Sequence, residues 1–309
     1  MKKRIIYNLS PFNNNMDTSV AEYIIKKVLA FFLIYCVSAV LGEAIIIGIL
    51  YCMGYDPLHG VMPAGQIGEL LPYYGFIIFS LATFAYCRLI EKRTIKPIAL
   101  SEKTVDYLLG AMLAVILLFI VIGICCFLRT MMFLGFNTDV NTKRLILWAL
   151  GFGIQGAAEE IMCRGFLLRS LQKRVSVPIA ILISSTAFAI PHLPSLLEAD
   201  LVYAVVGIIN LYLISIILSI LVLQRSDIWI ACGLHSVWNF ILYVIMGLSL
   251  SGSESVSEGV ILFSVKDASV LNGAEYGIEA SFITTIVLGM FLFVTVIMGR
   301  GRIGKNGIQ

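Results

Sequence analysis

A few strongly polar side chains interrupt the apolar stretches of this sequence. They are Glu43, which lies outside every motif, and Glu159, Glu160, Arg164, His192, His235 and Asn239. A charged side chain at bilayer depth costs about 2.5–3.5 kcal/mol, so such residues usually face a protein interior or a wet cavity. A carboxylate, two imidazoles and a carboxamide around one water molecule could hydrolyse an amide, because the reaction needs a base for the water and donors to the oxyanion.

The spacing within AAEEIMCRGF separates two roles for its charged residues. Glu160 and Arg164 are four residues apart on one helix face, so we predict an ion pair that offsets part of the burial cost. Glu159 is rotated about 100° away from Glu160 and is free to point elsewhere. The pattern therefore predicts an ion pair for Glu160 and a different environment for Glu159.

The two histidine motifs also use a four-residue spacing. Phe188 and His192 frame FAIPH, and His235 and Asn239 frame HSVWN. The imidazole of His235 and the carboxamide of Asn239 therefore project into the same space. Pro191 directly precedes His192 and could kink its helix, which would move the ring. A bend is one way to reconcile His192, about fourteen residues deep in its span, with Glu159 and His235, about eight or nine deep.

Composition identifies the elements that must position these side chains. The chain has 309 residues, of which 59% are hydrophobic and 13% are charged. Soluble proteins carry about 25% charged residues, so the composition excludes a soluble enzyme. A net charge of +3 without a basic stripe gives no reason to expect nucleic-acid binding, and seven cysteines without a CxxC pair favour neither a disulfide framework nor a structural zinc site.

Eight apolar stretches are long enough to cross about 30 Å of hydrocarbon. We predict an all-α, polytopic transmembrane helical bundle that forms a single membrane domain over residues 1–309. The expected spans lie near 28–53, 70–87, 107–128, 145–168, 178–197, 201–223, 228–248 and 280–299. The break near 198–200 is the shortest separation between two of these spans.

The distribution of Lys and Arg predicts the orientation. With both termini in the cytoplasm, the inner segments hold 17 of these residues and the outer loops hold 4. We therefore expect an integral protein of the cell membrane, with the lipid bilayer as one partner. The longest outer loop, about 249–279, is acidic and rich in Ser and Gly; we expect it to be solvated and identify no function in it.

The ordered motifs EExxxR, FxxxH and HxxxN resemble those of the CPBP family of intramembrane glutamic endopeptidases. That family includes type II CAAX prenyl proteases and proteins of bacteriocin processing and self-immunity. The similar region is a catalytic core of about 145–245. The resemblance implies that Glu159 and His192 activate a water, and that His235 and Asn239 stabilise the oxyanion. Glu160, Arg164 and Phe188 would have supporting roles, and no cofactor is expected.

Other functions fit parts of the same pattern. A zinc peptidase could use Glu159, His192 and His235 as ligands, although the sequence has no HExxH. A non-proteolytic immunity or membrane scaffold protein could keep the fold without the reaction. A proton-coupled transporter also uses buried Glu and His, but we detect no inverted repeat. The leading interpretation is a peptidase whose partner is a membrane-associated peptide or protein substrate, with no nucleic acid.

Overall fold

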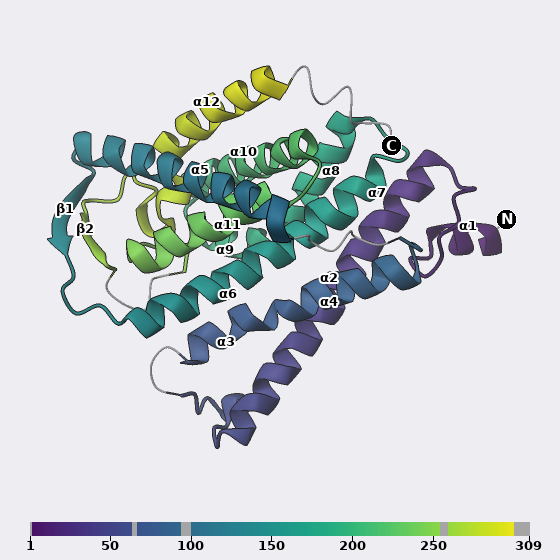
Figure 1. The fold of residues 1–309 in the computed structure, drawn as a ribbon, viewed down its shortest axis with the longest axis horizontal. Helices are drawn as coiled ribbons and strands as arrows, with labels where there is room; N and C mark the ends of the chain where they lie inside the picture. Colours follow the sequence, from purple (N-terminus) through teal and green to yellow (C-terminus); the bar gives the residue numbers. More distant parts are fainter. Residues whose placement is uncertain (1, 64–66, 94–99, 254–258, 300–309) are drawn as a thin grey trace. The chain divides into compact units, whose positions relative to one another are not determined.

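The fold is almost entirely helical in the computed structural model of the chain (Figure 1). The structure describes residues 2–63, 67–93, 100–253 and 259–299. These residues group into two compact units, one within Met1–Leu100 and Ile154–Ala187 and the other within Ser101–Gly153 and Phe188–Gln309. The prediction of an all-α fold is confirmed.

The first unit is built around one long helix, α2, against which α3 and α4 pack (Figure 1). Its elements before residue 100 are α1 (Lys2–Leu9), α2 (Val20–Cys52), a 3₁₀ turn (Pro57–His59), α3 (Ile67–Gly75) and α4 (Ile77–Leu89). Its later elements are the end of α6 (Thr142–Glu160), a π-helix (Ile161–Leu168), α7 (Arg169–Leu171) and most of α8 (Val177–Ala189).

In the second unit, α10 packs against α11 and α12. Its helices are α5 (Leu100–Phe127), the start of α6, α9 (Leu193–Glu198), α10 (Leu201–Arg225), α11 (Trp229–Phe240) and α12 (Phe282–Gly299). Its other elements are a π-helical turn (Ile241–Ile245), 3₁₀ turns (Ile190–His192, Ala274–Tyr276 and Ile278–Ala280) and the strands β1 (Met131–Phe136) and β2 (Ile261–Val265). The two strands pair antiparallel, with an irregular register between Phe133 and Gly135. This two-stranded sheet is an addition to the predicted helices.

Seven helical segments among the described residues are long and apolar enough to cross a membrane. They are Val20–Cys52, Ile67–Leu89, Thr104–Phe127, Thr142–Leu171, Val177–Glu198, Leu201–Arg225 and Phe282–Gly299. The remaining expected span, 228–248, corresponds to the shorter apolar helix Trp229–Ile245, which at 1.5 Å per residue is about 25 Å long. Seven long apolar helices and this shorter one are approximately consistent with the prediction of about eight spans.

The first span begins earlier than its hydropathy predicts. The side chain of Ser19 accepts a hydrogen bond from the Glu22 amide, and the Glu22 carboxylate accepts one from the Ser19 amide. This reciprocal capping box satisfies two amides that a helix start leaves without partners. The helix therefore begins at Val20 rather than near residue 28, and it includes Lys26 and Lys27.

The fifth expected span is interrupted just before its histidine. Regular α-helix ends at Ala189, and Pro191 lies in the 3₁₀ turn Ile190–His192 that links α8 to α9. Proline removes a backbone donor and crowds the preceding turn, so the α-helical pattern cannot continue unchanged through it. The predicted break near residues 198–200 is confirmed, because α9 ends at Glu198 and α10 begins at Leu201. The kink at Pro191 stays a prediction.

Candidate active site

The glutamate motif lies where α6 changes its helical type. Glu159 and Glu160 are the last residues of α6, and the π-helix Ile161–Leu168 follows directly. Single-turn π-helical segments occur frequently at functional sites because they alter which side chains share a helix face. All eight residues of this π-helix are buried, so it is part of the packed interior.

The two adjacent glutamates have different surroundings. The Arg164 guanidinium donates to Glu160 at 2.8 Å, and both side chains are completely buried, which confirms the predicted ion pair. Glu159 is only partly buried, and its carboxylate accepts a hydrogen bond of 2.6 Å from the Gln155 side chain one turn earlier. Glu160 therefore has a structural partner of opposite charge, whereas Glu159 is held by a neutral amide.

Tyr35 and Gln155 are the residues near Glu159 that the sequence analysis missed. Tyr35, on α2, lies within electrostatic range of Glu159 and packs edge-on against Phe79 at 5.4 Å. Gln155 could have been found from its spacing, because it precedes Glu159 by four residues. Tyr35 lies more than a hundred positions away in the sequence, and no local pattern predicts that it is near Glu159.

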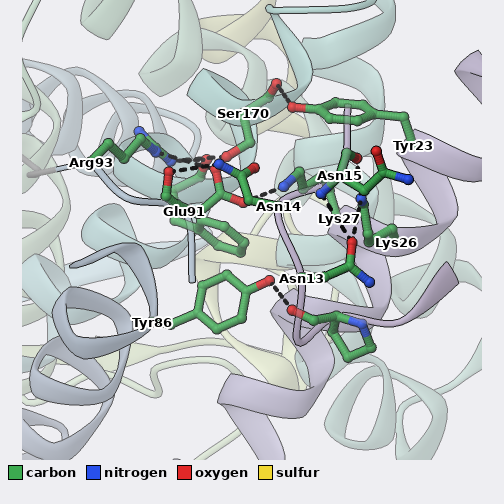
Figure 2. A network of polar contacts seen from close by, with 12 residues as sticks. Asn13, Asn14, Asn15, Tyr23, Lys26, Lys27, Tyr86, Glu91, Arg93 and Ser170 are labelled. Carbon is green, nitrogen blue, oxygen red and sulfur yellow. Dashed lines mark hydrogen bonds and ion pairs between the residues drawn. The ribbon is translucent and has the colours of Figure 1, made fainter. Parts of the chain in front are cut away.

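A polar network fixes the far end of the helix that carries the glutamates (Figure 2). Arg93 donates to the Phe166 carbonyl at 3.1 Å and to the Ser170 hydroxyl at 2.9 Å. The Tyr23 hydroxyl donates to the Ser170 carbonyl at 2.8 Å. Buried carbonyls need such donors, since an unsatisfied one costs about as much as a lost hydrogen bond. The network therefore ties α2 and the segment after α4 to the end of the π-helix.

The two buried lysines of this network each have polar partners. Lys27 is fully buried and forms an ion pair with Glu91, which is itself 3% exposed. Lys26, also fully buried, donates to the Asn15 carbonyl and the Asn13 side chain. Figure 2 shows these side chains converging from the N-terminal segment, α2 and the end of α4. Buried charges of this kind are tolerated only when paired and hydrogen-bonded.

The histidine motifs meet inside the second unit. The ring of Phe188 lies 5.0 Å from that of His192 and 5.9 Å from that of His235, so one aromatic side chain contacts both imidazoles. His192 Nδ1 lies 3.0 Å from the Phe188 carbonyl. A carbonyl only accepts, so Nδ1 must carry the proton, and in the neutral ring Nε2 is then the acceptor.

Helix α11 presents His235 and Asn239 one turn apart, and Asn239 is 8% exposed. A close crossing with α5 fixes this helix. A Cβ atom on Gly233 would lie 2.0 Å from the Tyr107 carbonyl oxygen, and one on Gly110 would lie 2.0 Å from that of Ile230. Glycine is required at both positions because the two backbones touch. This crossing is a second feature that the sequence analysis did not identify.

The structure thus describes two groups of predicted site residues, each within its own unit. Glu159, Glu160 and Arg164 belong to the first. Phe188, His192, His235 and Asn239 belong to the second, which brings the two histidines onto one phenylalanine. Among the described residues, no cluster of three or more His, Cys, Asp or Glu has the geometry to hold a metal ion. The alternative zinc set draws on both units and stays a prediction.

One comparison with known proteins bears on this region. Residues 141–241 match the family model of the Rce1-like type II CAAX prenyl endopeptidases. The match covers about a third of the chain and contains every predicted site residue. No curated protein sequence matches the chain. The predicted family resemblance is confirmed, and the match supports a membrane-embedded hydrolase.

Proposed function

Since residues 141–241 carry an Rce1-like domain, we propose that this protein is an intramembrane endopeptidase. Its substrate would be a membrane-associated or lipid-anchored peptide or protein, and its location the cell membrane. The observation that carries the proposal is the family match, because EExxxR, FxxxH and HxxxN all fall inside the matched residues in their expected order.

In this proposal a water molecule attacks the scissile carbonyl, with Glu159 and His192 as the groups that activate it. The proton lost by the water passes to Glu159 and then to the leaving amine, so no other co-reactant is needed. His192 Nε2 suits the role of acceptor, because Nδ1 is engaged by the Phe188 carbonyl. A fixed ring of this kind loses little orientational freedom when it binds the water.

His235 and Asn239 would donate to the oxyanion that forms on the carbonyl oxygen. Their common helix face and the close α5 crossing support this role, since such donors act only when they are oriented before the reaction. Glu160 and Arg164 would maintain the helix without touching substrate, and Phe188 would separate the two imidazoles. No cofactor enters this mechanism.

The test uses the purified full chain in proteoliposomes and a farnesylated CAAX-type peptide with a fluorophore and quencher flanking the cleavable bonds. The same peptide without the lipid measures whether the anchor matters. We expect Glu159→Ala and His192→Ala to reduce cleavage about 10²–10⁴-fold, and His235→Ala or Asn239→Ala about 10²–10³-fold. The matched control is His59→Ala, because His59 is exposed and lies in a loop of the first unit.

Two further arms separate the alternatives. Cleavage that persists after exhaustive chelation supports the metal-free mechanism, whereas loss that zinc restores supports the zinc variant. If wild type and all four variants cleave the lipidated peptide equally, the peptidase proposal is wrong. A folded wild-type protein that binds the peptide without cleaving it would instead favour the immunity or scaffold function.

A further inference from the structure

The polar segment between α11 and α12 does not behave as the solvated loop expected for 249–279. Within its described part, Asn272 is 1% exposed, Tyr276 is 6% exposed and Ile278 is 2% exposed. Tyr276 and Ala280 pack with Leu196 of α9 in one apolar cluster. The expectation of a solvated loop is therefore wrong for these residues, because the chain folds back onto the helices of its own unit.

Several hydrogen bonds hold Glu279 in this segment. Its carboxylate accepts hydrogen bonds from the Trp238 indole at 3.1 Å, the Ser251 amide at 2.7 Å and the Ser251 hydroxyl at 3.2 Å. Its backbone carbonyl accepts a fourth, from the Asn210 side chain of α10 at 2.8 Å. Hydrogen bonds to a charged acceptor are about twice as strong as neutral ones, so this carboxylate is a firm anchor point.

Trp238 stands between the two residues of the HxxxN motif. It follows His235 by three positions and directly precedes Asn239, and its side chain is 6% exposed. An indole has two side-chain torsions, so holding its N–H fixes the ring and limits rotation of the helix that carries it. A helix turns by about 100° per residue, and even a small rotation of α11 would redirect both motif side chains.

The same segment also approaches the other histidine. Tyr276 hydrogen-bonds Ser195 and Ser251, and the Ser195 hydroxyl donates to the His192 carbonyl at 3.1 Å. Burial, with the nearby charge of Glu279, raises the pKa of Tyr276 to about 12, so its hydroxyl remains a donor at neutral pH. The segment therefore contacts both elements that carry the histidines.

We propose that Glu279 is a positioning residue, which through the Trp238 indole sets the orientation of His235 and Asn239. This inference rests on the proposed peptidase function and assigns a role to a residue outside every motif. Glu279 touches no reacting atom in this proposal. It acts by holding α11 in the rotation that aims its two donors at the developing oxyanion.

The experiment combines kinetics with a spectroscopic probe of the contact. Glu279→Ala, Glu279→Gln and Trp238→Phe are compared with the matched control Glu275→Ala, an exposed acid of the same segment. Cleavage of the farnesylated peptide gives kcat and KM. In parallel, ¹⁵N-labelled indole resonances are recorded in micelles. The chain has three tryptophans, and Trp238→Phe identifies the signal of Trp238 by its loss.

We expect Glu279→Ala to lower kcat about 10- to 100-fold, the loss that a misplaced catalytic group produces. KM should change little, because substrate binding is preserved. Glu279→Gln should lie between wild type and alanine, since its amide keeps one acceptor oxygen for the indole. Trp238→Phe should lower kcat similarly, and the double variant Glu279→Ala with Trp238→Phe should be no worse than either single change, because both remove one contact.

Additive losses in the double variant, or an unchanged kcat in Glu279→Ala, would overturn the proposal. Glu279→Gln keeps the side-chain size, so it decides the matter if the alanine variant fails to fold. If wild type cleaves no peptide, the proposed function fails while the indole measurement still tests the contact. In that case a Trp238 resonance that moves in Glu279→Gln but not in Glu275→Ala supports the positioning role, and an unmoved one refutes it.

Discussion

The buried Glu160–Arg164 pair predicts an unusual order of stability among four variants. The two side chains are completely buried and their charged atoms lie 2.8 Å apart. Removing one member of such a pair leaves an uncompensated buried charge, which costs about 3–5 kcal/mol, whereas replacing both with apolar residues is often nearly neutral. A carboxylic acid can neutralise itself by taking up a proton, but a guanidinium in a protein cannot.

We therefore expect Glu160→Leu to be the most destabilised variant, with a loss of about 5 kcal/mol in the free energy of unfolding. Arg164→Leu should lose about 3 kcal/mol, because the remaining carboxyl can become neutral. The double variant Glu160→Leu with Arg164→Leu should lie within about 1 kcal/mol of wild type, since no charge remains to desolvate. The control is Glu198→Leu, because Glu198 is exposed at the end of α9.

Thiol labelling offers a direct assay for these variants. Cys87 and Cys163, both in the first unit, are buried, whereas Cys36 and Cys52 are exposed. A thiol-reactive dye that partitions into micelles should label the exposed pair first and the buried pair only on unfolding, so an SDS titration with labelling gives the free energy. If the double variant loses as much free energy of unfolding as the two single variants together, mutual charge neutralisation does not explain the stability of the pair. If it is stable yet cleaves nothing, the pair belongs to the chemistry and our structural assignment is wrong.

Two further predictions concern other parts of the chain. Lys173 is exposed, but desolvation of its ammonium by neighbouring groups and the charge of Arg93 lower its pKa from the ordinary 10.5. The folded state thus binds this proton less tightly than the unfolded chain, and stability rises with pH between the lowered pKa and 10.5. Lys173→Gln should accordingly raise the midpoint of SDS unfolding at pH 7, and the gain should vanish as the pH approaches 10.5; a pH-independent gain would contradict this. Gly233→Ala should destabilise the protein by about 1–3 kcal/mol and reduce cleavage, because its Cβ would meet the Tyr107 carbonyl. Gly123→Ala on α5, whose Cβ would meet open space, should be tolerated in the same SDS titration and cleavage assays, and equal losses in the two variants would refute the crossing argument.

The features that sequence predicted correctly depend on local spacing. Apolar stretches of membrane-crossing length, a four-residue separation between Glu160 and Arg164, and a proline before His192 each determine structure within a few turns. The helix end at residue 198 and the pairing of Glu160 with Arg164 follow from these local rules. Nothing distant in the chain is needed to establish them.

The start of the first span shows why features that depend on distant residues were not predicted from the sequence. The adjacent residues Lys26 and Lys27 lower the hydropathy of any window that contains them, so the sequence predicts a first span that begins near residue 28. In the structure both are fully buried in α2, and Lys27 is neutralised by Glu91, 64 positions away. The cost of burying a cation depends on a partner that no window around residue 27 contains. Hydropathy therefore placed the helix start eight residues too late.

Glu279 illustrates the same limit in a polar segment instead of an apolar span. Its segment contains five acidic residues in a Ser- and Gly-rich context, and composition gives each of them the same expectation of exposure. Glu275 is exposed, as expected. Glu279, four positions later, accepts hydrogen bonds from Trp238 and Ser251 instead. The two residues differ because the chain returns onto α10 and α11 at Glu279. The hydrogen-bond donors around a polar residue therefore decide whether it acts on a site, and the polarity of its neighbours in the sequence does not.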